Sequence, residues 1–289
     1  MLALRAYAKI NLGLRILRLR NDGYHDLETV FHRINLFDEL ELDSADTISM
    51  ECSAAELPSD ERNLSYRAAL LLRKELARGD GVRIKLKKKI PLGAGLGGGS
   101  SDAASTLRGL LRLWQTTLPI DRLRSVAAQL GSDVPYFLEK GTAYATGRGD
   151  VLDYFHVDIP YWIVVVSPDL HISTAWAYRE LKNTQRSVRN DRAPRSSLKD
   201  LLIENLNDPR MLQNLIRNDF EPIVLGTHDP VVRLKRGLYD VGADFVQLSG
   251  SGSAVYGLFK TEAVARTAAK SFSGKQAVSV TGPNFDPDL

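Results

Sequence analysis

The sequence predicts an α+β fold, built as one large domain or as two ordinary ones. The chain has 289 residues, and domains commonly hold about 150 residues each. Its first third shows alternating polar and apolar residues, as in antiparallel strands. A glycine-rich segment then joins a strand to a helix, and the last third alternates helical patterns with short strands. These observations together predict helices packed on sheets whose first strands are antiparallel.

Composition and charge exclude several classes of protein. The chain is 44% hydrophobic and 25% charged, close to the globular average, which excludes general disorder and a collagen-like or low-complexity chain. A net charge of +3 is too slight to indicate nucleic-acid binding. The longest apolar run, Tyr161 to Val166, is far short of the roughly 20 residues of a membrane helix. We therefore expect neither a nucleic-acid nor a membrane partner.

The cysteine and histidine content argues against a disulfide and a metal cluster. Cys52 is the single cysteine, and the five histidines show no paired metal spacing, so neither an intrachain disulfide nor a thiolate cluster is expected. Arg5 and Lys9 interrupt any signal-peptide hydrophobic region, and no transit-like extension precedes the first expected strand. We therefore expect a protein of the reduced cytoplasm.

The elements expected before the glycine-rich segment follow from periodicity. Alternation over Ala8 to Leu17 predicts a half-buried strand, and a turn follows at Asn21 to Gly23. Leu27 to Asp43 predicts one or two further strands. Asn63 to Leu76 predicts an amphipathic helix, and Val82 to Ile90 predicts another strand.

After the glycine-rich segment, the pattern predicts two helices and then a second set of strands. The second of these helices lies near Ile120 to Leu130. The expected strands cover residues 159–166, 245–248 and 254–259, and a Gly250 to Ser253 turn joins the last two. Arg186 to Ser197 is polar and basic and predicts a loop of open role. A domain break is expected between about Gly149 and Pro160.

The segment from Gly93 to Gly99 holds five glycines between a strand and a helix. Glycine tolerates positive φ and lets backbone amides approach an anion closely. The following helix start adds unpaired N–H groups and a positive dipole end. Ser100 or Ser101 is expected as its N-cap, and Asp102 suits that end of the helix. The segment therefore predicts a phosphate site, against the simpler interpretation of a flexible connector.

Two other nucleotide motifs compete for this segment. A phosphate loop of the Walker type needs Lys after its last glycine, where this chain has Ser100. The spacing Gly93-x-Gly95-x-x-Gly98 matches a dinucleotide fingerprint, and Asp121 falls near its acidic position. That alternative requires a parallel sheet and nicotinamide binding. However, Asp121 begins a helix instead of ending a strand, and the preceding strands look antiparallel. The protein-kinase motifs are absent.

Three ordered motifs resemble those of the GHMP kinase superfamily. They are Ala8-Lys-Ile-Asn-Leu-Gly-Leu14, the segment from Pro91 to Ala104, and Leu248-Ser-Gly-Ser-Gly-Ser253. The resemblance implies a two-domain α+β fold. An ATP-binding domain of mixed or antiparallel sheet and helices would cover residues 1–155, and a substrate-side, sandwich-like α/β domain residues 156–289.

Three shorter strings narrow the resemblance to one branch. They are Ala6 to Leu12, Asp22 to Leu27 and Gly131 to Phe137. They are similar to those of the members that use ATP to phosphorylate the tertiary 2-hydroxyl of a cytidine diphosphate-linked methylerythritol, on the non-mevalonate route to isoprenoids. The resemblance implies Asp133 as the base that accepts the hydroxyl proton and Lys9 as its neighbour. Alone, each could be a turn aspartate or a solvated strand lysine.

The same resemblance implies a substrate subsite. Tyr24 and a second ring would stack on cytosine, and His25 would recognise its edge. Tyr178 is the preferred second ring and Trp176 the alternative. Asn11 would contact a substrate hydroxyl or phosphate. The other implied substrate-binding residues, in the second glycine turn, are Gly250 and Gly252.

The implied nucleotide subsite is larger. ATP would bind at Pro91, Gly93, Ala94, Gly95, Leu96, Gly97, Gly98, Gly99, Ser100, Ser101, Asn63 and Lys88. Lys87 to Lys89 could instead be the solvated end of an edge strand. ATP implies Mg²⁺, which takes few protein ligands; Ser101 is one possible ligand, and no glutamate is identified.

We expect a small-molecule cytidine diphosphate substrate and a monomer or weak homodimer. A catalytically silent binding protein of the same fold is the rival, although Lys9 and Asp133 are both present.

Overall fold

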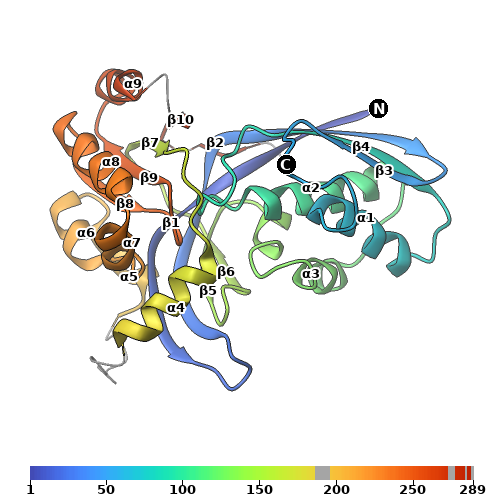
Figure 1. Cartoon of the computed structure of the whole chain (residues 1–289), viewed down its shortest axis with the longest axis horizontal. Coiled ribbons are helices and arrows are strands. Elements are labelled where there is room, and N and C mark those ends of the chain that lie inside the picture. Colours follow the sequence, from blue (N-terminus) through green and yellow to red (C-terminus); the bar gives the residue numbers. More distant parts are fainter. Residues whose placement is uncertain (186–195, 273–276, 284, 288–289) are drawn as a thin grey trace.

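Two sheets flanked by helices form the molecule (Figure 1). The computed structural model describes residues 1–185, 196–272, 277–283 and 285–287. The strands of the first sheet are β1 (Leu2–Leu19), β2 (His25–Ala45), β3 (Ile48–Cys52), β4 (Gly81–Lys87), β5 (Thr142–Thr146) and β6 (Val151–Phe155). Those of the second sheet are β7 (Trp162–Ser167), β8 (Phe245–Leu248), β9 (Val255–Phe259) and β10 (Ala277–Thr281).

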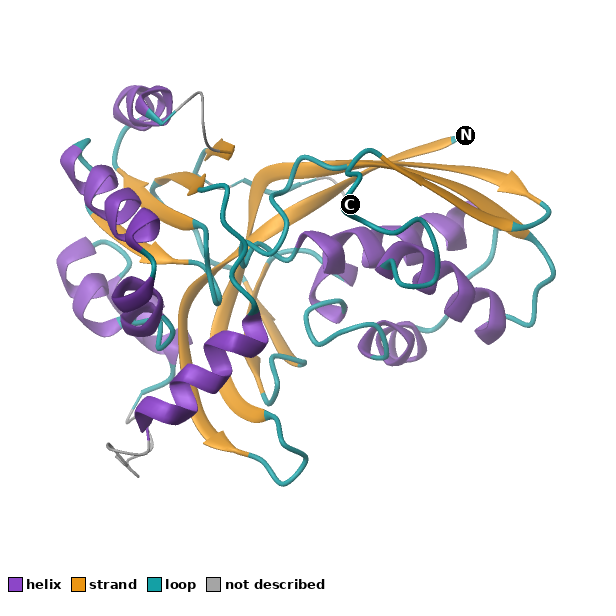
Figure 2. Ribbon diagram, in the orientation of Figure 1, coloured by secondary structure: helices purple, strands orange, loops and turns teal. Residues whose placement is uncertain are grey.

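The helices divide between the two sheets. Those following the first strands are α1 (Leu64–Glu75), α2 (Gly98–Leu113), α3 (Ile120–Ala128) and the short 3₁₀ turn η1 (Pro135–Leu138). The later ones are α4 (Thr174–Gln185), α5 (Leu198–Asn205), α6 (Pro209–Leu215), α7 (Glu221–Thr227), α8 (Asp229–Asp240) and α9 (Glu262–Ser271). Figure 2 shows α1 to α3 gathered on one side of the long first-sheet strands and the later helices grouped around the second sheet. Among the described residues, no helix is long and apolar enough to cross a membrane.

The first sheet is mixed and the second is antiparallel. The first has the order β3-β4-β2-β5-β6, with β1 paired to β2, and its single parallel pair is β3 with β4. The second has the order β10-β7-β9-β8. The strand before the glycine segment, β4, runs antiparallel to its neighbour β2. The parallel sheet that the dinucleotide alternative requires around Gly93 is therefore not found among the described strands.

Strand β1 joins the two halves of the molecule. The sequence predicts a strand with one face in water, but every residue from Ala6 to Leu14 is buried, so that expectation was wrong. Its apolar residues, such as Ile10, pack with Val165 and Tyr256 of the second sheet. The opposite face carries Lys9 and points toward the helices of the first half. Both faces of β1 are buried because strands of the second sheet, which are distant in the sequence, pack on the face that carries Ile10.

Several element boundaries also differ from the sequence expectation. Residues 27–43 lie in the one long strand β2. The cap of α2 is Gly97, in the left-handed region at φ 70°, so neither Ser100 nor Ser101 caps the helix as expected. Glycine permits this because it has no Cβ to clash there. The cap of α1 is Asn63, whose side chain accepts from the Ser65 amide. The basic loop expected at residues 186–197 falls mostly outside the described residues.

Candidate active site

A cavity of about 980 Å³ lies where the two halves meet. Its volume is at the upper end of the ~300–1,000 Å³ typical of ligand pockets. It is lined by parts of β1 and β2, the whole glycine segment, the loop before η1, the start of α4 and the second glycine turn. The three motifs that carry the family resemblance therefore meet at one cavity, although they are far apart in the sequence.

The glycine segment is held against the second glycine turn by direct backbone packing. The Gly95 carbonyl accepts hydrogen bonds from the Lys9 ammonium and the Ser249 hydroxyl, both at 3.0 Å. A Cβ on Gly95 would lie 2.1 Å from the Ser249 carbonyl oxygen, and its φ is +76°. Glycine is therefore required here by both space and backbone conformation. The first residues of α2 line the cavity and present unpaired backbone amides to it.

Lys9 and Asp133, 124 positions apart in the sequence, lie side by side in this cavity. The Lys9 ammonium is 3.6 Å from the Asp133 carboxylate, and the two side chains are 5% and 32% exposed. Lys9 also donates to the Asn11 side chain at 2.6 Å, and Asn11 in turn donates to Thr29 at 2.9 Å. Burial lowers the pKa of Lys9, and the charge of Asp133 opposes that shift. The ammonium is thus fixed behind a carboxylate that faces the cavity.

Most of the residues expected at the nucleotide line the cavity. Those that do are Lys88, Pro91, Gly93, Ala94, Gly95, Leu96, Gly97, Gly98, Gly99 and Ser100. Two of the expected residues are not brought to it. The Ser101 hydroxyl is buried and donates to the Tyr7 carbonyl at 2.7 Å. Asn63 caps α1 and donates to the Pro58 carbonyl at 3.0 Å, so its neighbour Leu64 lines the cavity instead.

Lys88 is held in a buried ionic cluster. Its ammonium contacts the Asp38 carboxylate and, at 2.7 Å, the Asp102 carboxylate. Burial raises the pKa of Asp102 to about 8, and its second carboxylate oxygen has no hydrogen-bond partner in the structure. The solvated edge expected as the alternative at this point is wrong for Lys88. Lys87 and Lys89 pair with Glu39 at the surface, but β4 lies between β3 and β2, so the expected edge strand is wrong.

An aromatic wall forms the opposite end of the cavity. Tyr24 is 58% exposed, and it lines the cavity together with His25 and Tyr178. The His25 and Tyr178 rings stack, with centroids 5.0 Å apart and planes 19° apart. Trp176 instead packs edge-on against His228 at 4.9 Å and does not line the cavity. Of the two rings expected to complete the subsite, the structure brings Tyr178 to the cavity.

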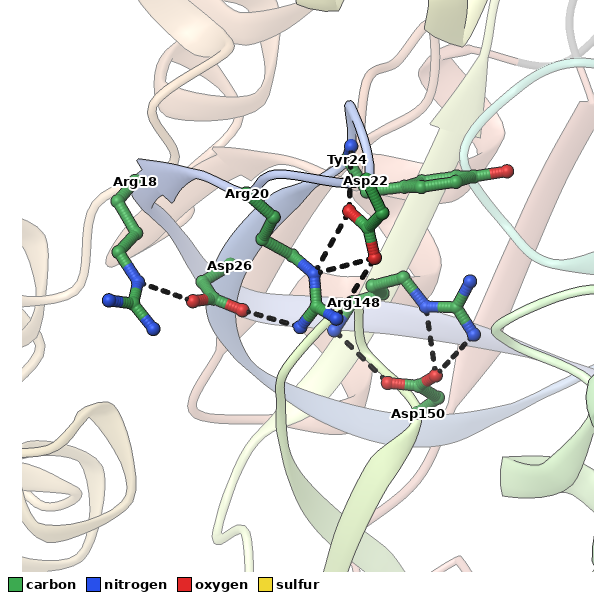
Figure 3. Close-up of polar contacts among 7 residues, drawn as sticks. All are labelled: Arg18, Arg20, Asp22, Tyr24, Asp26, Arg148 and Asp150. Atoms are coloured by element: carbon green, nitrogen blue, oxygen red, sulfur yellow. Dashed lines mark hydrogen bonds and ion pairs between the residues drawn. The ribbon is translucent and has the colours of Figure 1, made fainter.

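The hairpin turn that presents Tyr24 is braced by alternating charges (Figure 3). Arg18 and Arg20 share the Asp26 carboxylate, at 2.6 and 2.9 Å. Arg20 also pairs with Asp22 at 3.0 Å, and Asp22 accepts from the Tyr24 amide at 3.1 Å. Each such exposed pair is worth little alone, but together they fix the backbone next to the Tyr24 ring.

Arg148 is a cavity residue that the sequence analysis missed. It lies in the turn between β5 and β6, and its guanidinium is 5.1 Å from the centre of the Tyr24 ring. Asp150 holds it through bonds of 3.1 and 2.8 Å, and Figure 3 shows this pair beneath the ring. The sequence did contain a signal for this residue, because Gly147 and Gly149 on either side of Arg148 indicate a tight turn. In the structure both glycines have positive φ.

The second glycine turn contributes only partly as expected. Gly250 lines the cavity, and its carbonyl accepts from the Asn218 side chain at 2.8 Å. Gly252 does not line it; a Cβ there would meet Leu248 and Ile172 side chains at 3.0 and 3.4 Å. Gly252 therefore faces the core of the second half.

The described residues offer few ligands to a metal. Among them, no group of three or more His, Cys, Asp or Glu side chains could hold an ion. Asp133 is the one carboxylate among the described residues of the cavity wall, and the Ser100 hydroxyl is nearby on the wall at the start of α2. This donor set fits Mg²⁺, which keeps several waters and binds largely through substrate phosphates.

Comparison with known proteins identifies the family. Models of the GHMP kinases N terminal domain and the GHMP kinases C terminal domain match residues 63–141 and 200–277. Curated 4-diphosphocytidyl-2-C-methyl-D-erythritol kinases of Chlorobium phaeobacteroides and Chlorobaculum parvum are 47% and 46% identical to this chain, over 98% of both chains in each pair.

Solved structures agree with this result. A 4-(cytidine 5'-diphospho)-2C-methyl-D-erythritol kinase superposes with a TM-score of 0.80 at 32% identity, over 97% of this chain and 99% of that one. A homoserine kinase of Cytophaga hutchinsonii, at 18% identity and a TM-score of 0.71 over 97% of this chain and 95% of that one, shares the fold. The expected two-domain α+β fold is confirmed. The chain belongs to the GHMP kinases and, within them, to the 4-diphosphocytidyl-2-C-methyl-D-erythritol kinase family.

Proposed function

We propose that this kinase transfers the terminal phosphoryl group of ATP to the 2-hydroxyl of 4-diphosphocytidyl-2-C-methyl-D-erythritol, giving the 2-phosphate. The reaction belongs to non-mevalonate isoprenoid precursor biosynthesis. The observation that carries the proposal is the Lys9–Asp133 pair, 3.6 Å apart, in one cavity with the glycine segment. A silent binding protein would have no need of a buried ammonium beside a cavity carboxylate.

The chemistry follows from the arrangement of this pair. Asp133 accepts the proton of the substrate hydroxyl as its oxygen attacks the γ-phosphorus. The new oxygen–phosphorus bond forms while the bond to the β–γ bridging oxygen breaks, and ADP leaves. Lys9 stabilises the negative charge on the transferring group. Because Lys9 also donates to Asn11 and to the Gly95 carbonyl, its ammonium stays in place during the step.

As a GHMP kinase the protein uses ATP, and we propose that its triphosphate lies on the glycine segment. The unpaired amides at the start of α2 and the positive end of that helix favour an anion there. Lys88 lines the same wall, where its ammonium pairs with the Asp38 and Asp102 carboxylates. Mg²⁺ would be held by the phosphates, with the Ser100 hydroxyl as a protein ligand. The buried Ser101 hydroxyl already donates to Tyr7. The metal would neutralise phosphate charge.

The substrate end of the cavity is proposed to be the aromatic wall. Tyr24 and Tyr178 would supply flat faces for the cytosine, and His25, whose ring stacks on Tyr178, lines the same part of the cavity. Asn11 and Gly250 lie nearer to Lys9 and would contact the remainder of the substrate. We further propose that the protein acts as a monomer or weak homodimer in the cytoplasm.

The substrate assignment is tested by an ADP-release assay coupled to NADH oxidation. The cytidine-containing erythritol is compared with mevalonate and homoserine at equal concentrations. We expect turnover with the first and negligible turnover with the other two. A preference for either competitor would overturn the assignment, and ADP release without any acceptor sets the background rate.

Replacing Tyr24 by alanine should weaken binding of the cytidine substrate selectively. Stacking of a base on an aromatic ring is worth roughly 1–3 kcal/mol, so KM for this substrate should rise about tenfold while KM for ATP is unchanged. Tyr24→Phe keeps the ring and is the control.

Tyr178→Ala should raise the same KM, whereas Trp176→Ala should not. The opposite order would assign the second ring to Trp176.

A further inference from the structure

We propose that Arg33 is a positioning residue that holds the η1 turn and thereby places the Asp133 carboxylate opposite Lys9. Arg33 lies on β2 and pairs with Lys9 across the β1–β2 ladder, so both side chains are on the same face of the sheet. The inference rests on the proposed role of Asp133 and adds a residue to it that no sequence motif indicates.

Arg33 binds the backbone of the segment that follows Asp133. Its side chain is buried, with the residue 4% exposed. One guanidinium nitrogen donates to the Glu139 carbonyl at 2.5 Å and lies 3.5 Å from the Tyr136 carbonyl. These carbonyls belong to η1 and to the residue after it, and the Tyr136 carbonyl also accepts from the Tyr154 hydroxyl at 2.8 Å. The cation therefore caps the end of the turn.

The same guanidinium also contacts the side chains of the turn. Its central carbon is 5.6 Å from the Tyr136 ring centre and 5.8 Å from that of Phe137. On the other side, a Cβ at Gly97 would lie 3.0 Å from the Phe137 ring. The turn is thus packed between Arg33 and the glycine segment, and a shift of Arg33 would move it relative to both.

Asp133 depends on this segment because it has few contacts of its own. Its carboxylate is 3.6 Å from Lys9 and accepts from the Ser132 hydroxyl at 3.3 Å. The four-residue turn η1 begins two residues later, at Pro135, and a 3₁₀ turn of that length has little stability alone. The place of the carboxylate is therefore set largely by what holds the turn.

Arg33 is an unfavourable choice if its role is only to fill the core. Among the described residues it has no carboxylate partner, and its Nε makes no hydrogen bond. Arg108 is also largely buried with two unpaired nitrogens, and burial, then the charges of Arg33 and Arg112, lower the pKa of Arg108 to about 10. Burying a cation that has no carboxylate partner destabilises a fold. An apolar side chain of similar length would avoid that cost, so stability alone does not explain Arg33.

The test compares Arg33→Met with Arg108→Met. Both remove one charge from the same cluster, but no hydrogen bond joins Arg108 to η1 among the described residues. We expect Arg33→Met to lower kcat about tenfold or more, because a displacement of ~1 Å can cost up to about 10²-fold in rate. KM for ATP should stay within about twofold, and the melting temperature should not fall. Arg108→Met should keep kcat, and Arg33→Lys should recover part of it. Unchanged kcat in Arg33→Met would overturn the inference.

A double-mutant cycle with Asp133→Asn separates positioning from general damage. If Arg33 acts through Asp133, adding Arg33→Met to Asp133→Asn should cost nothing further; an additive loss would show an independent structural effect and overturn the inference. If Arg33→Met fails to fold, the same cycle is measured with Arg33→Lys. Normal turnover of Asp133→Asn alone would instead refute the proposed role of Asp133, and no turnover of the cytidine substrate by the unaltered enzyme would refute the proposed function, so these failures are distinguishable from that of the inference.

Discussion

Asp133→Asn should lower kcat by about 10²-fold or more while largely preserving ATP binding. A positioned general base contributes roughly 10²–10⁴-fold to a rate, and the amide cannot accept the hydroxyl proton. Lys9 should remain in place because it also donates to Asn11 and to the Gly95 carbonyl. Steady-state kinetics with both substrates, together with direct titration of ATP, measures the two effects separately.

The control for this variant is Asp158→Asn. Asp158 is an exposed carboxylate paired with His156, so its replacement removes the same charge away from the cavity wall. It should leave kcat unchanged. Near-normal turnover of Asp133→Asn would remove Asp133 from the chemistry, and loss of ATP binding in parallel with kcat would indicate disruption of the cavity instead of a missing base.

Gly95→Ala should reduce kcat/KM by about 10²-fold or more. Its Cβ would lie 2.1 Å from the Ser249 carbonyl oxygen and 3.2 Å from the Gly252 amide nitrogen. Both contacts are with backbone atoms of the second glycine turn, so the glycine segment must move away from that turn. Because Lys9 binds the Gly95 carbonyl, that movement also displaces the ammonium, and displacements of ~1 Å can cost about 10²-fold. Full kinetics with ATP and acceptor varied in turn measures the loss.

Gly141→Ala is the matched control for backbone strain. Gly141 also has positive φ, at +93°, but a Cβ there would meet nothing within 4 Å, and the residue does not line the cavity. It should lose some stability and keep its activity. Equal kinetic losses in the two variants would show that positive φ, and not contact with the second glycine turn, explains the effect at Gly95.

Local patterns predicted the elements of the fold better than their burial. The alternation at β4 and the amphipathic pattern from Asn63 to Leu76 are local signals, and both elements formed close to the expected residues. The burial of β1 on both faces was not predictable, because its second face is covered by Tyr256 and its neighbours, more than two hundred positions away. The start of α2 was misplaced because cap preferences favour serine, while Gly97 uses a left-handed backbone.

In the candidate site, too, local sequence patterns predicted some features, whereas others depend on residues that are distant in the sequence. Composition and helix-start signals were enough to predict an anion site at the glycine segment. The proximity of Lys9 to Asp133 came only from the family resemblance, since no local pattern joins residues so far apart. Trp176 and Tyr178 could not be separated because they are two positions apart on one helix and the direction of each depends on tertiary packing. Arg148 was missed because no strands were predicted around it and a domain break was expected from about Gly149 to Pro160.

The double burial of β1 has a consequence for biosynthesis of the protein. This strand leaves the ribosome before the second sheet does, and Tyr256, whose hydroxyl donates to the Asn11 carbonyl at 3.1 Å, is translated 245 residues after Asn11. Domains of large proteins generally fold during synthesis from the amino terminus onward. Here the nascent half that contains β1 must wait with an apolar strand face uncovered, and the pocket around Lys9 matures only when the segment that contains Tyr256 has emerged.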